Sequence, residues 1–106
     1  MIYEKKIKTV ADADSLYEQL IKSAEEASKF AQVALEYRSS HYFGPVDMDA
    51  MRNTRTSLIE KMSNMLVIIS VLQYKLDCEE ETETRFVEIF DKEFEKIEGS
   101  ASNFNE

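Results

Sequence analysis

The segment from residue 58 to residue 76 constrains the fold more than any other part of the chain. It runs for nineteen residues without Gly or Pro. Its apolar side chains recur at alternating intervals of four and three residues, which places them on one stripe of a helix. The stripe consists of Leu58, Met62, Met65, Ile69, Leu72 and Leu76. Apolar residues cover other sides as well between Met65 and Leu72, so we predict the central, buried helix of a bundle.

The composition agrees with a helical protein. The chain has 106 residues, of which 43% are hydrophobic, with only two Gly and one Pro for the turns of an all-β fold. We therefore predict an all-α bundle of three main helices in one domain over residues 14–98, completed by dimerisation. The expected parts are an arm over 1–13 that is either extended or a short additional helix, helices over about 15–37, 48–77 and 82–97, and a flexible tail over 99–106.

Local signals predict where the helices begin and end. Ser15 followed by Glu18 three residues later has the spacing of a capping box. The pair Gly44-Pro45 predicts the break before the second long helix, which Asp47 or Asp49 would cap. Gly99 is expected to end the last helix.

Two further stripes predict how the outer helices pack. Small side chains line one side of the first long helix, where they would allow a neighbouring backbone to approach closely. This alanine ridge comprises Leu20, Ala24, Ala27, Ala31 and Ala34, and we expect the helix that carries it to lie against the central helix. In the last helix Phe86, Phe90, Phe94 and Ile97 share one stripe, which we interpret as core.

The charge limits the possible partners. With 21 acidic and 13 basic side chains the formal net charge is −8, so direct binding to nucleic acid is not expected. An acidic surface attracts basic proteins instead. The apolar segment over 65–72 needs more cover than two other helices of a small chain supply, which predicts a homodimer with the central helix near the twofold axis.

No membrane segment or leader is expected. The longest strictly apolar run, from Met65 to Ile69, is far shorter than the roughly 20 residues that span a bilayer. A signal peptide is not predicted at the start, and the single Cys78 has no partner for an intramolecular disulfide. We therefore expect a cytoplasmic protein and an unreactive thiol.

The segments 25–29 (EEASK) and 58–66 (LIEKMSNML) carry a family resemblance. They resemble the MazG-like, all-α nucleoside triphosphate pyrophosphohydrolases, which have a Glu-x-x-Glu pair on one helix and a Glu-x-x-Asp pair on the next. The resemblance covers roughly residues 16–97, including the helix order and the linker position. It implies four carboxylates that hold Mg²⁺, the ion that bridges the substrate phosphates.

The residues at the four implied ligand positions depart from this pattern. Glu26 matches the first ligand, but Lys29, Lys61 and Asn64 stand where the other three carboxylates belong. The two ammonium groups would repel a divalent cation and are able to replace its charge in a salt bridge with Glu26. An ordinary solvated helix face is the alternative interpretation of these charges.

Other candidate residues carry weaker signals. Arg38, Arg52 and Arg55 are possible phosphate or partner contacts, because Arg suits phosphate geometry, or they are simply solvated. His41 has no second His or Cys for a metal site and is interpreted as a loop contact.

The first functional hypothesis is a catalytically inactive MazG-like protein that binds another macromolecule, such as a phage-type, anti-CRISPR-like inhibitor of a host enzyme. No cofactor is expected for it. The alternatives are an Mg²⁺-dependent pyrophosphohydrolase with a non-standard site, using the residual carboxylates Glu25, Glu26 and Glu60, or a nucleotide binder without turnover.

Overall fold

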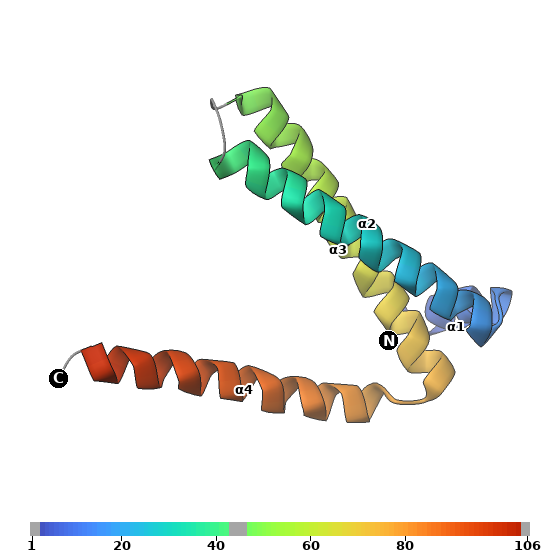
Figure 1. The fold of residues 1–106 in the computed structure, drawn as a ribbon. Helices are drawn as coiled ribbons and strands as arrows, with labels where there is room; N and C mark the ends of the chain where they lie inside the picture. Colours follow the sequence, from blue (N-terminus) through green and yellow to red (C-terminus); the bar gives the residue numbers. More distant parts are fainter. Residues whose placement is uncertain (1–2, 43–46, 105–106) are drawn as a thin grey trace. The chain divides into compact units, whose positions relative to one another are not determined.

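The computed structural model describes residues 3–42 and 47–104, and every regular element in these ranges is an α-helix. The helices are α1 (Glu4–Ala13), α2 (Leu16–Tyr42), α3 (Met48–Leu76) and α4 (Glu79–Phe104) (Figure 1). The all-α prediction is confirmed, with α1 as the short additional helix. The chain forms two units, residues 1–75 and residues 76–106, which are described separately. The single domain predicted over 14–98 stays a prediction.

The first unit is a helical hairpin with α1 packed at one end. In Figure 1, α2 and α3 run side by side in opposite directions, and α1 lies at the end away from their connection. Ala11 of α1 is completely buried there. The hydroxyls of Ser40 on α2 and Thr54 on α3 lie 3.0 Å apart and join the two helices near the connection.

Two predicted caps are confirmed. The Ser15 hydroxyl accepts a hydrogen bond from the backbone N–H of Glu18 at 3.1 Å, which begins α2. Asp47, rather than Asp49, caps α3, because its carboxylate accepts the N–H groups of Asp49 at 3.0 Å and Ala50 at 3.1 Å. Gly44 and Pro45 lie outside the described residues.

The predicted packing of α2 against α3 is confirmed, but the alanine ridge is not the contact line between them. Ala24, Ala27 and Ala31 are exposed, whereas Ala34 is half-buried. The side of α2 that is turned towards the rest of the first unit instead carries larger residues, two of which, Glu26 and Ser40, form hydrogen bonds with α3. Its buried or half-buried members are Gln19, Ser23, Glu26, Phe30, Val33, Tyr37 and Ser40.

The central helix is also less buried within one chain than predicted. Val71 is the only hydrophobic side chain of α3 that is fully buried among the described residues, at 2% exposure. Leu66 is 66% exposed and Val67 is 57% exposed. Within the first unit α3 has neighbours only on part of its circumference, so a large apolar area of α3 has no cover from α1 and α2.

The boundaries of α4 differ from the prediction at both ends. Asp77, with a positive φ of 48°, follows the last residue of α3, and α4 begins at Glu79 instead of residue 82. Three glutamates in its first turn suit the positive end of the helix dipole. Gly99 does not end α4, because its backbone does not adopt the left-handed conformation of a helix stop. The segment 99–104 predicted as a tail is helical.

Candidate functional site

Two of the four implied ligand positions, Glu26 and Asn64, line a groove of about 430 Å³ between α2 and α3 on one flank of the hairpin. We call this the Glu26 groove. It is lined by Lys22, Glu25, Glu26, Asn64, Val67 and Ile68. The structure thus brings together Glu25, Glu26 and Asn64, and adds Lys22 to them.

Both carboxylate oxygens of Glu26 have a protein partner. The ammonium of Lys29 lies 3.3 Å from Oε1, one turn along α2. The side-chain amide of Asn64, which comes from α3, donates a hydrogen bond to Oε2 at 3.4 Å. The Glu26 side chain is 21% exposed, so its charge is partly shielded from water. Two of the three replaced positions therefore bind the one carboxylate that remains.

This arrangement has a clear chemical consequence. Lys29 is a cation and Asn64 presents an amide N–H, so both groups face Glu26 as donors rather than as metal ligands. Among residues 3–42 and 47–104, no three Asp, Glu, His or Cys side chains form a cluster suited to a metal ion. The groove lining contains the carboxylates of Glu25 and Glu26, and Glu26 already has two donors, so the groove offers fewer oxygen ligands than Mg²⁺ prefers.

The remaining two positions from the sequence prediction are on α3, about one turn before Asn64. Glu60 is exposed on α3, and Lys61 is half-buried. The lining of the Glu26 groove, within the described part of the chain, includes neither of them. The expected salt bridge to Glu26 is therefore made by Lys29, and the contact from α3 is made by Asn64.

Lys22 is a groove residue that sequence reasoning missed. Its ammonium donates a hydrogen bond to the Asp14 carboxylate, between α1 and α2. This hydrogen bond lowers the pKa of Asp14 below its ordinary value of 3.8 and raises the pKa of Lys22 above 10.5. The pair is eight residues apart across a turn, a spacing that no rule for contacts along one helix predicts.

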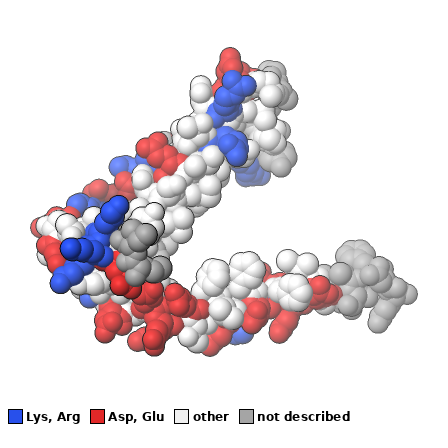
Figure 2. All heavy atoms as spheres, turned by 180° about the vertical axis from the view of Figure 1, so that it is seen from behind, with Lys and Arg blue, Asp and Glu red and all other residues white. Residues whose placement is uncertain are grey.

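The three arginines are exposed at the end of the hairpin that lies next to the α2–α3 connection. Arg38 is in the last part of α2, and Arg52 and Arg55 are in the first turns of α3. Figure 2 shows basic side chains in blue at this end. His41 belongs to the last turn of α2 rather than to a loop, and its ring stacks on Tyr37 with centroids 5.5 Å apart.

Neither a membrane-spanning helix in the described residues nor a similar known protein helps to assign a function. No helix in the described ranges is long and apolar enough to cross a bilayer. In comparisons with known proteins, no family model, no curated protein and no solved structure matches the chain. The resemblance to the MazG-like family therefore stays a prediction.

Proposed function

We propose that this chain is a catalytically inactive protein with a MazG-like helical scaffold that acts by binding another macromolecule. The observation that carries the proposal is the pairing of Glu26 with Lys29 and Asn64. Positions that hold metal-binding carboxylates in the family here supply an ammonium and an amide, so internal contacts take the place of a divalent cation. The helical scaffold then provides a surface to which another macromolecule binds.

The charge distribution supports a basic partner. The helix α4 carries nine acidic and three basic side chains, and two of the basic ones, Arg85 and Lys96, pair with glutamates of the same helix. Figure 2 shows acidic side chains gathered at the beginning of α4 and along one side of it. Such a surface suits a basic channel or cleft. An inhibitor of a host enzyme in the cytoplasm, of the phage-encoded anti-CRISPR kind, fits this chemistry.

Exposed apolar stripes support the homodimer. Ile59, Met62, Leu66 and Ile69 form one uncovered stripe on α3, and the exposed part of the alanine ridge forms another on α2. On both α2 and α3 the exposed stripe lies one residue, about 100°, further round the helix than the face that contacts the neighbouring helix. Because α2 and α3 run in opposite directions, this equal rotation brings both stripes to the same side of the hairpin. The Glu26 groove is on the other side. A second copy packed on the stripes places α3 near the twofold axis.

A hydrolysis assay tests the absence of catalysis. Purified protein is incubated with a panel of deoxynucleoside triphosphates and Mg²⁺ or Mn²⁺, and pyrophosphate is measured. We expect no release above the buffer control. Release that Glu26→Ala abolishes would make the chain an enzyme. Calorimetric binding of a nucleotide without release would instead favour the nucleotide binder.

Restoring the missing carboxylates gives a complementary test. The triple variant Lys29→Glu, Lys61→Glu, Asn64→Asp should gain Mn²⁺ affinity, with a Kd on the order of 1 mM or tighter, as an open site of several carboxylates allows. The wild type should show no binding by calorimetry at the same concentrations. The matched control adds Glu26→Gln to the triple variant and should lose the gain. Equal Mn²⁺ binding by the wild type and the triple variant would contradict the proposal.

A further inference from the structure

The joints between the helices differ in how strongly the sequence specifies them. Ser15 caps the beginning of α2, and Asp47 caps the beginning of α3. The joint between α3 and α4 consists of Asp77 and Cys78, and we call it the 77–78 joint. Cys78 directly precedes α4, but cysteine is not among the residues that cap helices well. The joint contains no Gly or Pro either, so no strong local signal ends the helix there.

The backbone of Asp77 is in an unfavourable conformation. Its φ of 48° lies in the left-handed region, and no other non-glycine residue of the described ranges has a positive φ. The residue that follows a helix adopts this conformation easily when it is glycine, because glycine has no β-carbon. Asp tolerates it better than most residues but less well than Gly. The interruption between α3 and α4 therefore depends on a conformation that the Asp77 side chain disfavours.

The flanking sequence is compatible with a helix that continues through the joint. No Gly or Pro occurs over residues 46–98. The apolar stripe of α3 ends at Leu76, and its alternation of four and three residues can be continued into α4 as one heptad register. Three apolar residues of α4 lie on this series, with glutamates at the positions between them: Phe86, Phe90 and Ile97. With a helical joint, α3 and α4 would form one helix about 85 Å long.

The charges at the joint favour the interruption. Four carboxylates line a cavity of about 370 Å³ there, those of Asp77, Glu79, Glu80 and Glu81. The three glutamates are in the first turn of α4, where the positive end of the helix dipole stabilises them. A continuous helix has no such end at this point. In it, Asp77 would also lie three and four residues before glutamates of the same helix, and like charges at these intervals repel each other.

We infer that the 77–78 joint is a two-state switch, in which the four carboxylates favour the interruption and their neutralisation favours one continuous helix through α3 and α4. The inference goes beyond the proposed function, because it concerns a change of conformation rather than the choice of a partner. Basic groups that pair with these carboxylates shift the balance in the same direction as neutral substitutions do.

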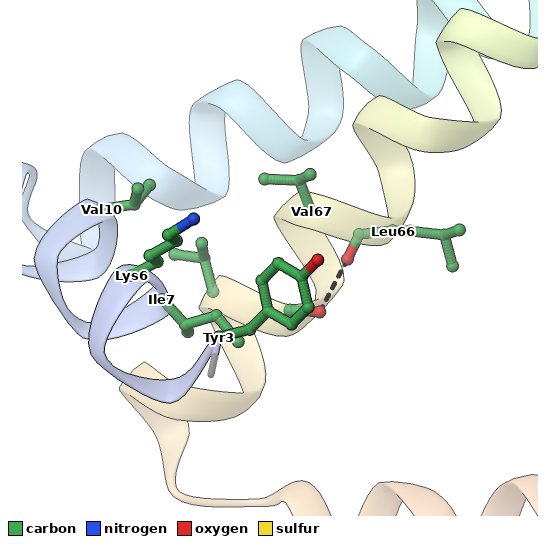
Figure 3. A pocket seen from close by; sticks show the side chains of 8 residues that line it. Tyr3, Lys6, Ile7, Val10, Leu66 and Val67 are labelled. Atoms are coloured by element: carbon green, nitrogen blue, oxygen red, sulfur yellow. Dashed lines mark hydrogen bonds between the residues drawn. The ribbon is translucent and has the colours of Figure 1, made fainter. Parts of the chain in front are cut away.

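The packing of the first unit confines the change to the joint. In Figure 3 the Tyr3 ring extends from α1 towards α3, beside Leu66 and Val67. Side chains of α1 and α3 line a common groove there, and Val71, which belongs to this lining, is 2% exposed. Val71 lies little more than one turn before the end of α3. Because α3 is packed up to this point, we expect the change of state at residues 77–81.

Nuclear magnetic resonance on the full-length chain measures the balance. The Cα secondary chemical shift of Cys78 reports the fraction of continuous helix, because this residue is helical only in the continuous state. Amide exchange gives a second measurement. The N–H of Thr82 donates to the Cys78 carbonyl at 2.9 Å, and the three N–H groups before it have no acceptor within α4. In a continuous helix these groups, at residues 79–81, donate to α3 and the joint and become protected.

Neutral substitutions test the role of charge. The triple variant Glu79→Gln, Glu80→Gln, Glu81→Gln keeps the size of the side chains and removes three charges. It should raise the ratio of continuous to interrupted helix about fivefold or more, because three favourable interactions with the helix dipole are lost.

The matched control makes the same three changes elsewhere in α4. The variant Glu93→Gln, Glu95→Gln, Glu98→Gln should leave the ratio within about twofold, because these residues are in the second half of the helix. Equal responses of the two triple variants would overturn the inference, since the position of the charges at the joint would then have no effect.

Substitutions of Asp77 test the backbone. Asp77→Gly should lower the ratio about threefold or more, because Gly adopts a positive φ freely and is a poor helix residue. Asp77→Ala should raise the ratio by a similar factor, because Ala favours the helix and disfavours a positive φ. Asp77→Ala added to the triple variant at residues 79–81 should give the strongest amide protection there. Far-ultraviolet circular dichroism confirms that each variant is helical.

Two further results would overturn the inference. One is a Cys78 shift that keeps its wild-type value when Asp77→Ala is combined with the triple variant. The other is a rise of the ratio with Asp77→Gly, a test that remains available if the glutamine variants fail to fold. Either result would leave the hydrolysis assay and its interpretation unchanged, because the joint contains none of the residues of the Glu26 groove.

Discussion

The α2–α3 hairpin and α4 are made of helices of similar length, 27 and 29 residues against 26, but they are held by different interactions. The hairpin has hydrogen bonds between helices, one between the Ser40 and Thr54 hydroxyls and one from the Asn64 amide to Glu26. The ion pairs of α4, Arg85 with Glu88 and Lys96 with Glu93, join residues three apart on the same helix. Pairs of the latter kind contribute only about 0.2 to 0.5 kcal/mol each.

The two regions differ in the number of helices that they contain, because α4 is alone in its unit, whereas α2 and α3 pack on each other. The apolar stripe of α4 is as regular as that of α3, yet all of its described side chains from Glu79 to Gly99 are exposed. Most of the stability of a helix in a protein comes from covering such a stripe. Substitutions in the hairpin should therefore change the stability of one chain more than substitutions in the stripe of α4 do.

The largest expected effect separates the two regions directly. Val71→Asp buries an unpaired carboxylate at the core of the first unit, where the valine is 2% exposed, and should lower the free energy of unfolding by about 3 to 5 kcal/mol. Val87→Asp makes the same change on α4 at a half-exposed position and should alter it by no more than about 0.5 kcal/mol in the monomer. Urea unfolding at low protein concentration, followed by circular dichroism, measures both values.

Equal destabilisation by the two substitutions would contradict the comparison. It would mean that α4 contributes to the stability of one chain as much as α3 does. A concentration series provides the control, because a loss that appears with Val87→Asp only at high protein concentration belongs to the dimer.

A smaller effect is expected at the beginning of α3. Asp47→Ala removes the carboxylate that accepts two backbone N–H groups and should destabilise the hairpin by about 1 kcal/mol. Asp49→Ala is the matched control, because the Asp49 side chain is exposed in the first turn and does not provide the cap. Thermal unfolding should show a clear decrease in Tm for the first variant and a smaller one for the second. The reverse order would assign the cap to Asp49.

Helix class and caps could be predicted from the sequence because both depend on neighbours within a few residues. The spacing of Ser15 and Glu18 or the position of Asp47 determines a local hydrogen bond, and tertiary structure does not alter it. The existence of α2, α3 and α4 follows in the same way from stripes that repeat every three or four residues.

The contact face of α2 was not predictable by the same reasoning. Two stripes on this helix are compatible with packing: the alanine ridge with Ala27, and the side with Glu26 and Phe30. Periodicity shows that a stripe is apolar but does not show which neighbour covers it, and the pairing of Glu26 with Asn64 depends on residues 38 positions apart. The extent of α4 past Gly99 was missed because a glycine ends a helix only when its backbone turns left-handed.

The smallest expected effect concerns the ion pair between Asp14 and Lys22, which joins the end of α1 to α2. Because Lys22 lowers the pKa of Asp14, the stabilisation is present above pH 3.8 and is lost as the pH falls through the lower pKa of the folded state. Because Asp14 raises the pKa of Lys22, the stabilisation is complete below pH 10.5 and is lost as the pH rises through the higher folded value.

Asp14→Asn should therefore reduce Tm slightly at neutral pH and have less effect as the pH falls through the lowered pKa of the folded Asp14 carboxyl, where the wild-type group becomes protonated as well. Both groups are solvated, so the reduction should be well below that of Asp47→Ala. Calorimetric Tm values from pH 3 to pH 7 measure it, with Asp12→Asn on the exposed side of α1 as the control. If the two variants lose stability equally at pH 7, the ion pair does not hold α1 in place, and buried side chains such as Ala11 do so instead.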